Sequence, residues 1–411
     1  MERPGGNAPR TDSARLKATL EWAWFPVGFL LLAAACTADS ENPRSSHSMA
    51  GDWWELSQVP SVVLGDESAD GSPFLYRIRE GTVLPSGKIV LTQPQEVLRY
   101  ARNGDFEGYI GREGKGPGEF SITTAMSRLS GSDHIRIMDL LNRRVTTMTS
   151  QGEVLATWPL EGRGLPFGSR IVGQPDGSFI GYGWKSWLDR HQGPPVRNRA
   201  GARVDSVLVL RLTDSAVDTV SLWEGGVRVT ARAGNMNLTR TPPLGRRLLT
   251  AIGPGIIAHG YNDDGEFHLI GLDGVESNVV RMLAERREIT DRERSEAERD
   301  FLSRYGRNPL SGEDQESLLQ EIIQDAPKPR FLPMVDDAVF DSERNLWLRV
   351  FEPDPDEEVV WEVHSEEGVF LARVLLPFDL EILEIGGTYL LGLQKDSLDV
   401  ETVKKFELIK G

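Results

Sequence analysis

The chain is 411 residues long, enough for one large domain or for two or three domains of ordinary size. Hydrophobic residues make up 39% of it, which suffices for a core, and 42 glycines with 24 prolines indicate many turns. The net charge of −16 argues against non-specific nucleic-acid binding, which needs a basic surface. The single cysteine excludes an intramolecular disulfide.

The first 35 residues have the pattern of a secretory signal. Basic residues precede an apolar run over residues 22–35, which is short for a membrane span and ends in small residues. Cys36 follows three alanines directly, and this arrangement resembles the lipobox of bacterial lipoproteins, although Ala33 stands where leucine is usual. The resemblance implies a signal peptide over residues 1–35 and acylation of Cys36, which would anchor the protein to a membrane. Ordinary signal cleavage near Ala35 is the alternative.

Residues 36–52 are polar and have no hydrophobic periodicity. We expect them to form a flexible tether between the anchor and the folded part of the chain. The folded part is predicted to span residues 53–411.

Residues 111–120, with the sequence GREGKGPGEF, hold four glycines and one proline. Glycine tolerates positive φ and proline fixes φ, so this stretch is predicted to be a compact loop that crosses from one sheet to the next. Lys115 lies among glycines, but neither a Gly-Lys-Ser/Thr motif nor a helix start follows, so no phosphate site is expected.

Alternating apolar segments separated by turn signals fill most of the remaining chain. Gly104 and Gly152 mark equivalent turns 48 residues apart, a spacing typical of β-propeller blades. We therefore predict an all-β fold, a six-bladed β-propeller, and expect residues 54–64 to complete the last blade and close the ring. The six predicted units lie near residues 75–110, 121–158, 170–223, 250–281, 333–376 and 378–409.

A helical pair is predicted within this β pattern, at about residues 288–327. Thr290 and Glu293 form a capping-box signature at the start of its first helix. The second helix has an apolar face, which we expect to pack on one face of the propeller; a cover over a binding site is the alternative. That face consists of Leu318, Leu319, Ile322 and Ile323.

Three motifs resemble the NHL-like, six-bladed β-propeller proteins of bacterial cell envelopes. They are the loop at residues 111–120, the D-x-x-N-x-R-hydrophobic pattern of NHL blades at residues 139–145, and the closing DSLDVE at residues 396–401. The resemblance covers most of residues 53–411. It implies a propeller on the periplasmic or cell-surface side of the envelope, and it implies no particular reaction.

No catalytic, cofactor-binding or metal-binding residue is predicted. The histidines of the folded part show no paired spacing for metal ligands; they are His134, His191, His259, His268 and His364. His259 and His268 would approach each other if they flank one hairpin, but ordinary structural roles are favoured. Calcium bound through carboxylates and carbonyls is an alternative without a loop signature here.

Other residue types that often carry chemistry also have simpler explanations. The folded part lacks a Gly-x-Ser-x-Gly motif and a cysteine nucleophile. Tryptophans that could stack on a sugar are predicted to be core residues; they are Trp53, Trp54, Trp184 and Trp187. Paired carboxylates at Asp336–Asp337 and within residues 354–358 are common in an acidic chain, and the latter suggest a solvated hairpin loop.

The sequence thus predicts a lipid-anchored envelope propeller that serves as a binding or scaffold module for a small molecule or protein. Its ligand would sit at one mouth of the channel, where the loops between blades converge. The alternative is a metal-dependent hydrolase or lyase on the same ring, which requires several His, Asp, Glu or Asn side chains to converge at the axis.

Overall fold

The computed structural model describes residues 53–65, 73–160, 170–185, 201–233, 236–307, 315–355 and 357–411. All of them belong to the compact unit Gly51–Gly411. The predicted signal peptide, the tether and Cys36 lie outside the described residues. Strands dominate the described part, together with the helices α2 (Asp291–Tyr305) and α3 (Glu316–Asp325). Neither of these helices is long and apolar enough to cross a membrane.

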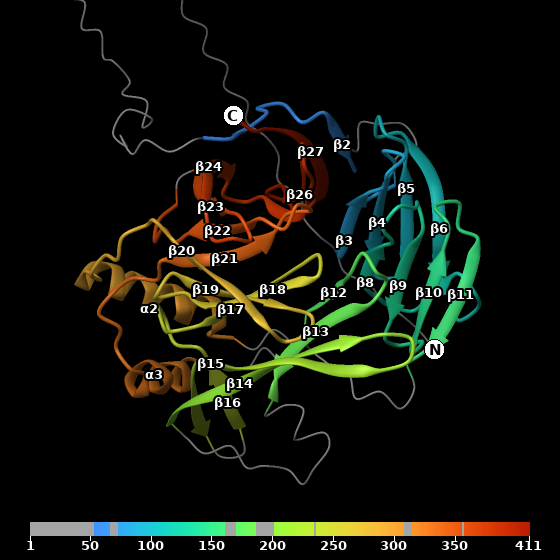
Figure 1. Cartoon of the computed structure of the whole chain (residues 1–411). Helices are drawn as coiled ribbons and strands as arrows, with labels where there is room; N and C mark the ends of the chain where they lie inside the picture. Colours follow the sequence, from blue (N-terminus) through green and yellow to red (C-terminus); the bar gives the residue numbers. More distant parts are fainter. Residues whose placement is uncertain are drawn as a thin grey trace, which may run out of the picture. The chain divides into compact units, whose positions relative to one another are not determined.

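The described strands form six sheets of four or five strands, in chain order (Figure 1). The first contains β3 (Glu80–Val83), β4 (Ile89–Gln93), β5 (Glu96–Tyr100), β6 (Phe106–Glu113) and β7 (Glu119–Phe120); the second contains β8 (Thr123–Arg128), β9 (Ile135–Asp139), β10 (Arg144–Met148) and β11 (Val154–Pro159). The third contains β12 (Ile171–Gly173), β13 (Phe179–Trp184), β14 (Gly201–Leu212), β15 (Val217–Ala233) and β16 (Met236–Arg240).

The remaining sheets follow the same meander. The fourth contains β17 (Leu248–Gly253), β18 (Ile256–Tyr261), β19 (Glu266–Gly271) and β20 (Glu276–Arg281); the fifth contains β21 (Val335–Phe340), β22 (Leu346–Val350), β23 (Glu358–His364) and β24 (Phe370–Pro377). The sixth contains β25 (Glu381–Ile385), β26 (Tyr389–Lys395) and β27 (Glu401–Ile409), joined by β1 (Glu55–Leu56) and β2 (Val62–Leu64).

Each sheet contacts the sheet that follows it in the chain (Figure 1), and contacts between β25 and β3 join the sixth sheet to the first. Hydrophobic clusters fill the spaces between neighbouring sheets; one of them joins residues of β21 and β22 to residues of β18 and β19. Such face-to-face packing of successive meander sheets is the architecture of a propeller. The predicted all-β, propeller-type fold is confirmed.

Strands from both ends of the described chain build the sixth sheet, as predicted. Both β1 and β2 pair antiparallel with β27, and Leu64 lies opposite Val403. Val62 and Leu64 are buried in a core cluster shared with the first sheet, whereas Val63 between them points to solvent. The alternation follows from the two-residue period of a strand. The N-terminal strands therefore cover the edge of β27 and join the two ends of the fold.

Gly104 and Gly152 occupy the same place in consecutive sheets, as their spacing predicts. Gly104 lies in the turn between β5 and β6 and has φ 96°, and Gly152 lies in the turn between β10 and β11 with φ 90°. Both turns need a left-handed residue, which glycine provides without a steric penalty.

The glycine-rich stretch at residues 111–120 connects the outer strand of the first sheet to β8 of the second, which confirms the predicted crossover. Its first three residues still belong to β6, and its ends pair in parallel as Arg112 opposite Glu119. Glu119 Oε2 accepts the N–H of Gly116 at 2.8 Å. An amide of the loop is thus already bound to a carboxylate of the same loop.

The D-x-x-N-x-R motif of the second sheet fastens this loop. The fully buried Asp139 carboxylate accepts four backbone N–H groups, including those of Ser121 at 2.7 Å and Ile122 at 3.2 Å. Asn142 donates to the carbonyl oxygen of Gly114 at 2.9 Å. Arg144 donates to three carbonyl oxygens of the loop at 2.6–2.8 Å. The motif therefore supplies the hydrogen-bond partners that an irregular, partly buried backbone needs.

The third sheet extends beyond its predicted limit at residue 223. Instead of ending there, β15 continues to Ala233 and pairs with β16. Gly225 and Gly226 suggest a break, but they lie inside β15, where a Cβ would collide with Trp184 or with the backbone of Arg246. The glycines thus mark a close approach of neighbouring chain segments within a strand.

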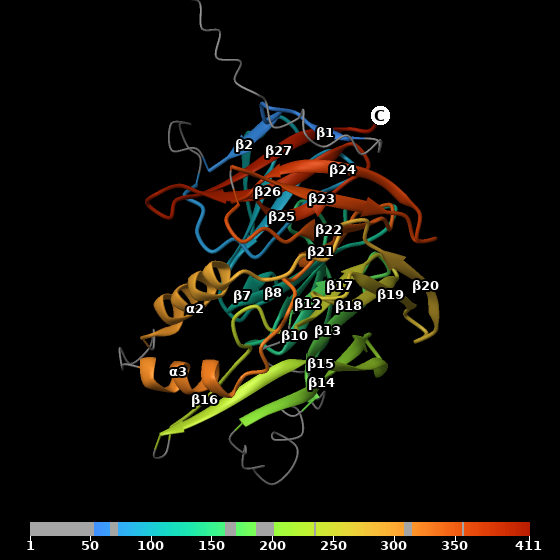
Figure 2. The same ribbon diagram turned by 90° about the vertical axis from the view of Figure 1, so that its left-hand side faces the viewer.

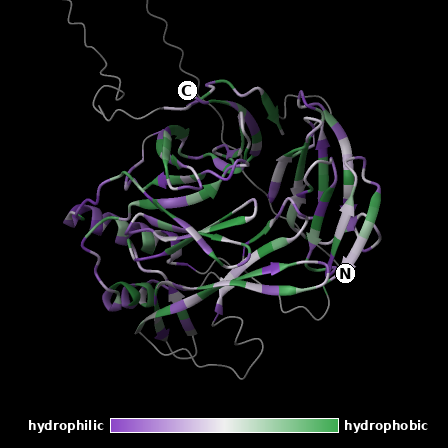
Figure 3. Ribbon diagram, viewed as in Figure 1, coloured by the Kyte–Doolittle hydropathy of each residue, from purple (hydrophilic) through white to green (hydrophobic). Residues whose placement is uncertain are grey.

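The helical pair covers this extension of the third sheet (Figure 2). The predicted capping box at Thr290 and Glu293 is present. The predicted apolar face of α3 is buried or partly buried against Val229, Ala231 and Leu238 of β15 and β16. The pair thus packs on the extended β14–β16 hairpins, whose part beyond residue 223 lies outside the predicted third unit. Figure 3 shows α2 as mostly hydrophilic, in keeping with its exposed position.

Candidate functional site: the central cavity

The first strand of every sheet faces a common cavity. These six inner strands are β3, β8, β12, β17, β21 and β25, and each lies at the edge of its sheet. They and the turns that follow them line a central cavity of about 200 Å³. An edge strand has unpaired N–H and C=O groups, so these groups face side chains or a bound molecule. The cavity is therefore the place where all six sheets can contribute to one site.

Where the inner strands end, the cavity wall is tied together by charged hydrogen bonds. Glu384 of β25 accepts the N–H of Val83 at 2.7 Å, the hydroxyl of Thr82 at 2.9 Å and the hydroxyl of Tyr389 at 2.8 Å. Arg128 of β8 donates to the carbonyl oxygen of Val83 at 2.7 Å and lies 3.8 Å from Glu384. These bonds join the sixth, first and second sheets at the edge of β3.

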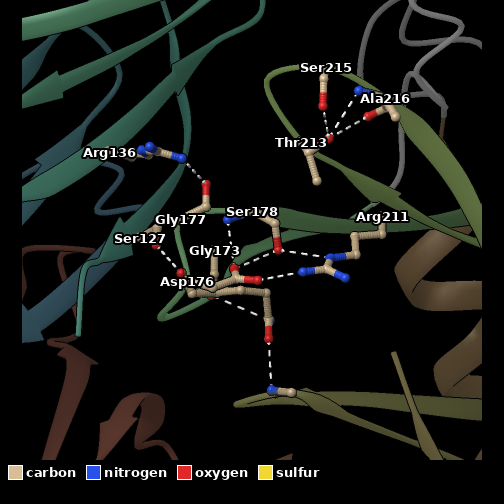
Figure 4. Close-up of polar contacts among 12 residues, drawn as sticks. Ser127, Arg136, Gly173, Asp176, Gly177, Ser178, Arg211, Thr213, Ser215 and Ala216 are labelled. Carbon is tan, nitrogen blue, oxygen red and sulfur yellow. Dashed lines mark hydrogen bonds and ion pairs between the residues drawn. The ribbon is translucent and has the colours of Figure 1, made fainter. Parts of the chain in front are cut away.

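The turn after β12 is held from both sides at the same end of the cavity. The Gln174 carbonyl accepts the Ser127 hydroxyl, and the Gln174 side chain accepts the N–H of Gly255 at 2.9 Å. Figure 4 shows Asp176 of this turn bound to Ser178 and Arg211 of the third sheet. The polar groups at this end of the cavity are therefore largely engaged with one another.

The opposite end, where the inner strands begin, differs. Glu80 is the first residue of β3, and Arg170 directly precedes β12. Both line the cavity, and neither side chain has a hydrogen bond or ion pair within the described part of the chain. Burial raises the pKa of Glu80 to about 7, the charge of Glu381 raises it further, and the charge of Arg170 opposes the rise.

Two further polar side chains lie within electrostatic range of Arg170. Burial raises the pKa of Tyr182 on β13 and the pKa of Asp337 on β21. The positive charge of Arg170 opposes both rises without cancelling them. Asp337 accepts only the N–H of Ala338 among the described residues, at 2.8 Å. Its neighbour Asp336 is engaged by two arginines outside the cavity lining.

The raised pKa of Glu80 gives a testable pH dependence. This carboxyl ionises at about pH 4.5 in the unfolded chain and at about pH 7 in the folded chain. The free energy of unfolding therefore decreases as the pH rises between these two values. Glu80→Gln removes the penalty, so we expect it to stabilise the protein by about 1–3 kcal/mol near pH 8 and to have little effect near pH 4.5. Thermal unfolding at the two pH values measures this; an equal effect at both would contradict it.

The structure brings His259 and His268 together as cross-strand partners of β18 and β19. The Trp223 ring packs against both, with ring centroids 5.0 and 5.1 Å away. The two ring nitrogens of His259 lie 3.0 Å from the hydroxyls of Ser221 and Thr250, and burial lowers its pKa to about 3. His259 is therefore a neutral, hydrogen-bonded residue between the third and fourth sheets.

The other candidate residues are dispersed. His134 and His364 lie in different sheets from this pair, and His191 is outside the described residues. No group of three or more His, Cys, Asp or Glu side chains is arranged to hold a metal ion within the described ranges. The metal-dependent alternative requires such a group.

Of the tryptophans, Trp54 packs edge-on against the buried Trp347 at 5.9 Å, as expected for a core residue, and Arg228 lies over the Trp184 ring. Trp53 is 40% exposed and thus departs from the predicted core position, because it lies at the margin of the fold beside β24. Trp187 lies outside the described residues.

Sequence reasoning missed Glu80 and Arg170. Neither belongs to a motif, and a charged residue beside a short strand ordinarily indicates a solvated strand end. The available signal is positional: in a propeller, the first residue of each unit lies beside the axis. That signal becomes useful only when the strand limits are known to within one residue.

No protein-family model matches the chain, and no curated protein matches it. Several solved structures resemble it over most of its length. A protein of Bacteroides fragilis classed as exported shares 14% identity with a TM-score of 0.43, over 87% of this chain and 96% of that chain. A DUF4221 member from Bacteroides vulgatus shares 10% identity with a TM-score of 0.46, over 88% and 99%.

A calcium-binding protein, regucalcin, from Agrobacterium tumefaciens shares 11% identity with a TM-score of 0.37, over 88% of this chain and 97% of that chain. At such identities and TM-scores, these similarities do not bear on what the chain binds or does.

Proposed function

We propose that the protein is a lipid-anchored, NHL-like envelope propeller that binds a small molecule in its central cavity. The observation that carries the proposal is the unpaired state of Glu80 and Arg170 in a cavity lined by all six sheets. Of the two, Glu80 is partly buried and Arg170 is exposed to solvent. A partly buried carboxylate without a hydrogen-bonding partner costs free energy, and binding sites commonly bear that cost until the ligand supplies the partner. The signal and lipobox pattern around Cys36 supports the location on the envelope.

Native mass spectrometry of the gently purified protein tests the binding function. We expect a small-molecule adduct on the wild-type chain that is absent from the double variant Glu80→Gln, Arg170→Met. The matched control is Glu285→Gln, Arg299→Met, which removes one exposed charge of each sign outside the cavity. An adduct that survives equally in all three proteins would place the ligand elsewhere and contradict the proposal.

The anchor has its own prediction. Cys36→Ser removes the thiol that would carry the lipid, so we expect the full-length protein to move from the membrane fraction to the soluble fraction. Moving the cysteine nine residues onward, in Cys36→Ser, Ser45→Cys, should not restore membrane association, because acylation depends on the preceding alanines. Fractionation followed by immunoblotting measures both variants; unchanged membrane retention of Cys36→Ser would exclude the lipid anchor.

A further inference from the structure

The charged side chains of the central cavity fall into two groups. Arg128 and Glu384 both bond to the backbone of Val83 on β3 and lie 3.8 Å from each other, and Asp341 accepts N–H groups of its own turn and the indole N–H of Trp347. Glu80 and Arg170 alone among the charged cavity-lining residues have no polar partner within the described part of the chain. The cavity thus offers one acid and one base that are free to bind a ligand.

The size of the cavity limits the ligand. At about 200 Å³ it is larger than an apolar cavity of roughly 150 Å³ that holds benzene, and smaller than the sites of roughly 300–1,000 Å³ that hold drug-sized molecules. A molecule with the bulk of a small amino acid therefore fits inside it.

The charges of Glu80 and Arg170 limit the choice of ligand further. A purely cationic ligand would satisfy Glu80 but bring a like charge toward Arg170, and a purely anionic ligand would do the reverse. A molecule with one group of each sign pairs both residues. Glu381 adds negative charge near the carboxylate of Glu80, which favours an ammonium group on that side.

We propose that the central cavity binds a small zwitterion of the α-amino-acid type, with its ammonium group on Glu80 and its carboxylate on Arg170. This inference rests on the proposed binding function and names the ligand class of the same site. The fork of the guanidinium can hold a carboxylate through two parallel hydrogen bonds. The apolar wall contributed by Val172, Ile252 and Leu383 would contact the side chain of the ligand.

The ionisation of Glu80 adds a pH signature. The ammonium group requires the carboxylate form, and the folded protein reaches that form only above about pH 7. Arg170 from the start of β12 and Glu381 from β25 are the charged groups that act on Glu80, with opposite signs. Affinity should therefore fall as pH decreases below 7, by about tenfold per pH unit in the limit of complete dependence.

Thermal unfolding and isothermal titration calorimetry with the twenty common amino acids test the proposal. For each one that raises the melting temperature, the matched probes are its amide, which lacks the carboxylate charge, and its N-acetyl derivative, which lacks the ammonium charge. We expect at least one amino acid to bind. Its two derivatives should bind wild type at least tenfold more weakly, and the variants Glu80→Gln and Arg170→Met should bind the free amino acid at least tenfold more weakly. Glu285→Gln and Arg299→Met should retain binding and, like wild type, lose affinity between pH 8 and pH 6, whereas the residual binding of Glu80→Gln should not change over this range.

The outcomes separate this inference from the proposed function. If amides or N-acetyl derivatives bind as well as the free amino acids and still depend on Glu80 or Arg170, the cavity is a binding site and the zwitterion is wrong. If no amino acid binds at millimolar concentration while native mass spectrometry shows a cavity-dependent adduct, the ligand class is also wrong. If both experiments show no cavity-dependent ligand, the proposed function fails as well.

Discussion

Replacing Asp139 with alanine should lower the free energy of unfolding by about 3–5 kcal/mol, one of the largest single-residue effects in the protein. The carboxylate is fully buried and accepts four backbone N–H groups and the side-chain amide of Asn142. Alanine leaves these donors without a partner, and an unsatisfied buried donor costs more than its hydrogen bond contributes.

Chemical denaturation followed by tryptophan fluorescence measures this effect. Asp139→Asn keeps one acceptor oxygen, so its loss should be intermediate between those of wild type and Asp139→Ala. Asp218→Ala, which removes an exposed carboxylate from β15, should change stability by less than about 0.5 kcal/mol. A loss below about 1 kcal/mol for Asp139→Ala would show that the crossover loop is held by other contacts.

Leu64→Ala should cost about 3 kcal/mol, because it opens a cavity where β2 joins the sixth sheet to the first. Leu64 is 1% exposed, whereas Val63 beside it is 39% exposed. Val63→Ala is therefore the matched control, on the same strand but with a side chain that points away from the core cluster.

The difference between these two variants tests whether the N-terminal strands close the fold. Differential scanning calorimetry should show a lower melting temperature and one cooperative transition for Leu64→Ala, and a near-native curve for Val63→Ala. Equal melting temperatures for the two variants would contradict the pairing of β2 with β27, because that pairing sets which residue points inward.

Local sequence signals predicted those parts of the fold that local chemistry determines. Gly104 and Gly152 mark turns because only glycine adopts their φ cheaply, and Thr290 with Glu293 marks a helix start because the two side chains satisfy free N–H groups. The apolar run at residues 54–64 likewise predicted the closing strand. Each of these signals is complete within a few residues of chain.

Tertiary contacts determined the parts that the sequence did not reveal. Gly225 and Gly226 suggest the end of a strand until the positions of Trp184 and Arg246 are known. Glu80 and Arg170 are about ninety residues apart in the chain, and they lie at the starts of different sheets. They form a candidate site only because these two sheets meet at one cavity. Charge alone did not distinguish them from the many charged residues of an acidic protein.

A crystal structure of the protein in complex with the amino acid that stabilises it most would test the central claim most directly. The account predicts electron density for one molecule in the central cavity, with its ammonium group at Glu80 and its carboxylate at Arg170. Density for that molecule at another surface, with only water in the central cavity, would contradict the account.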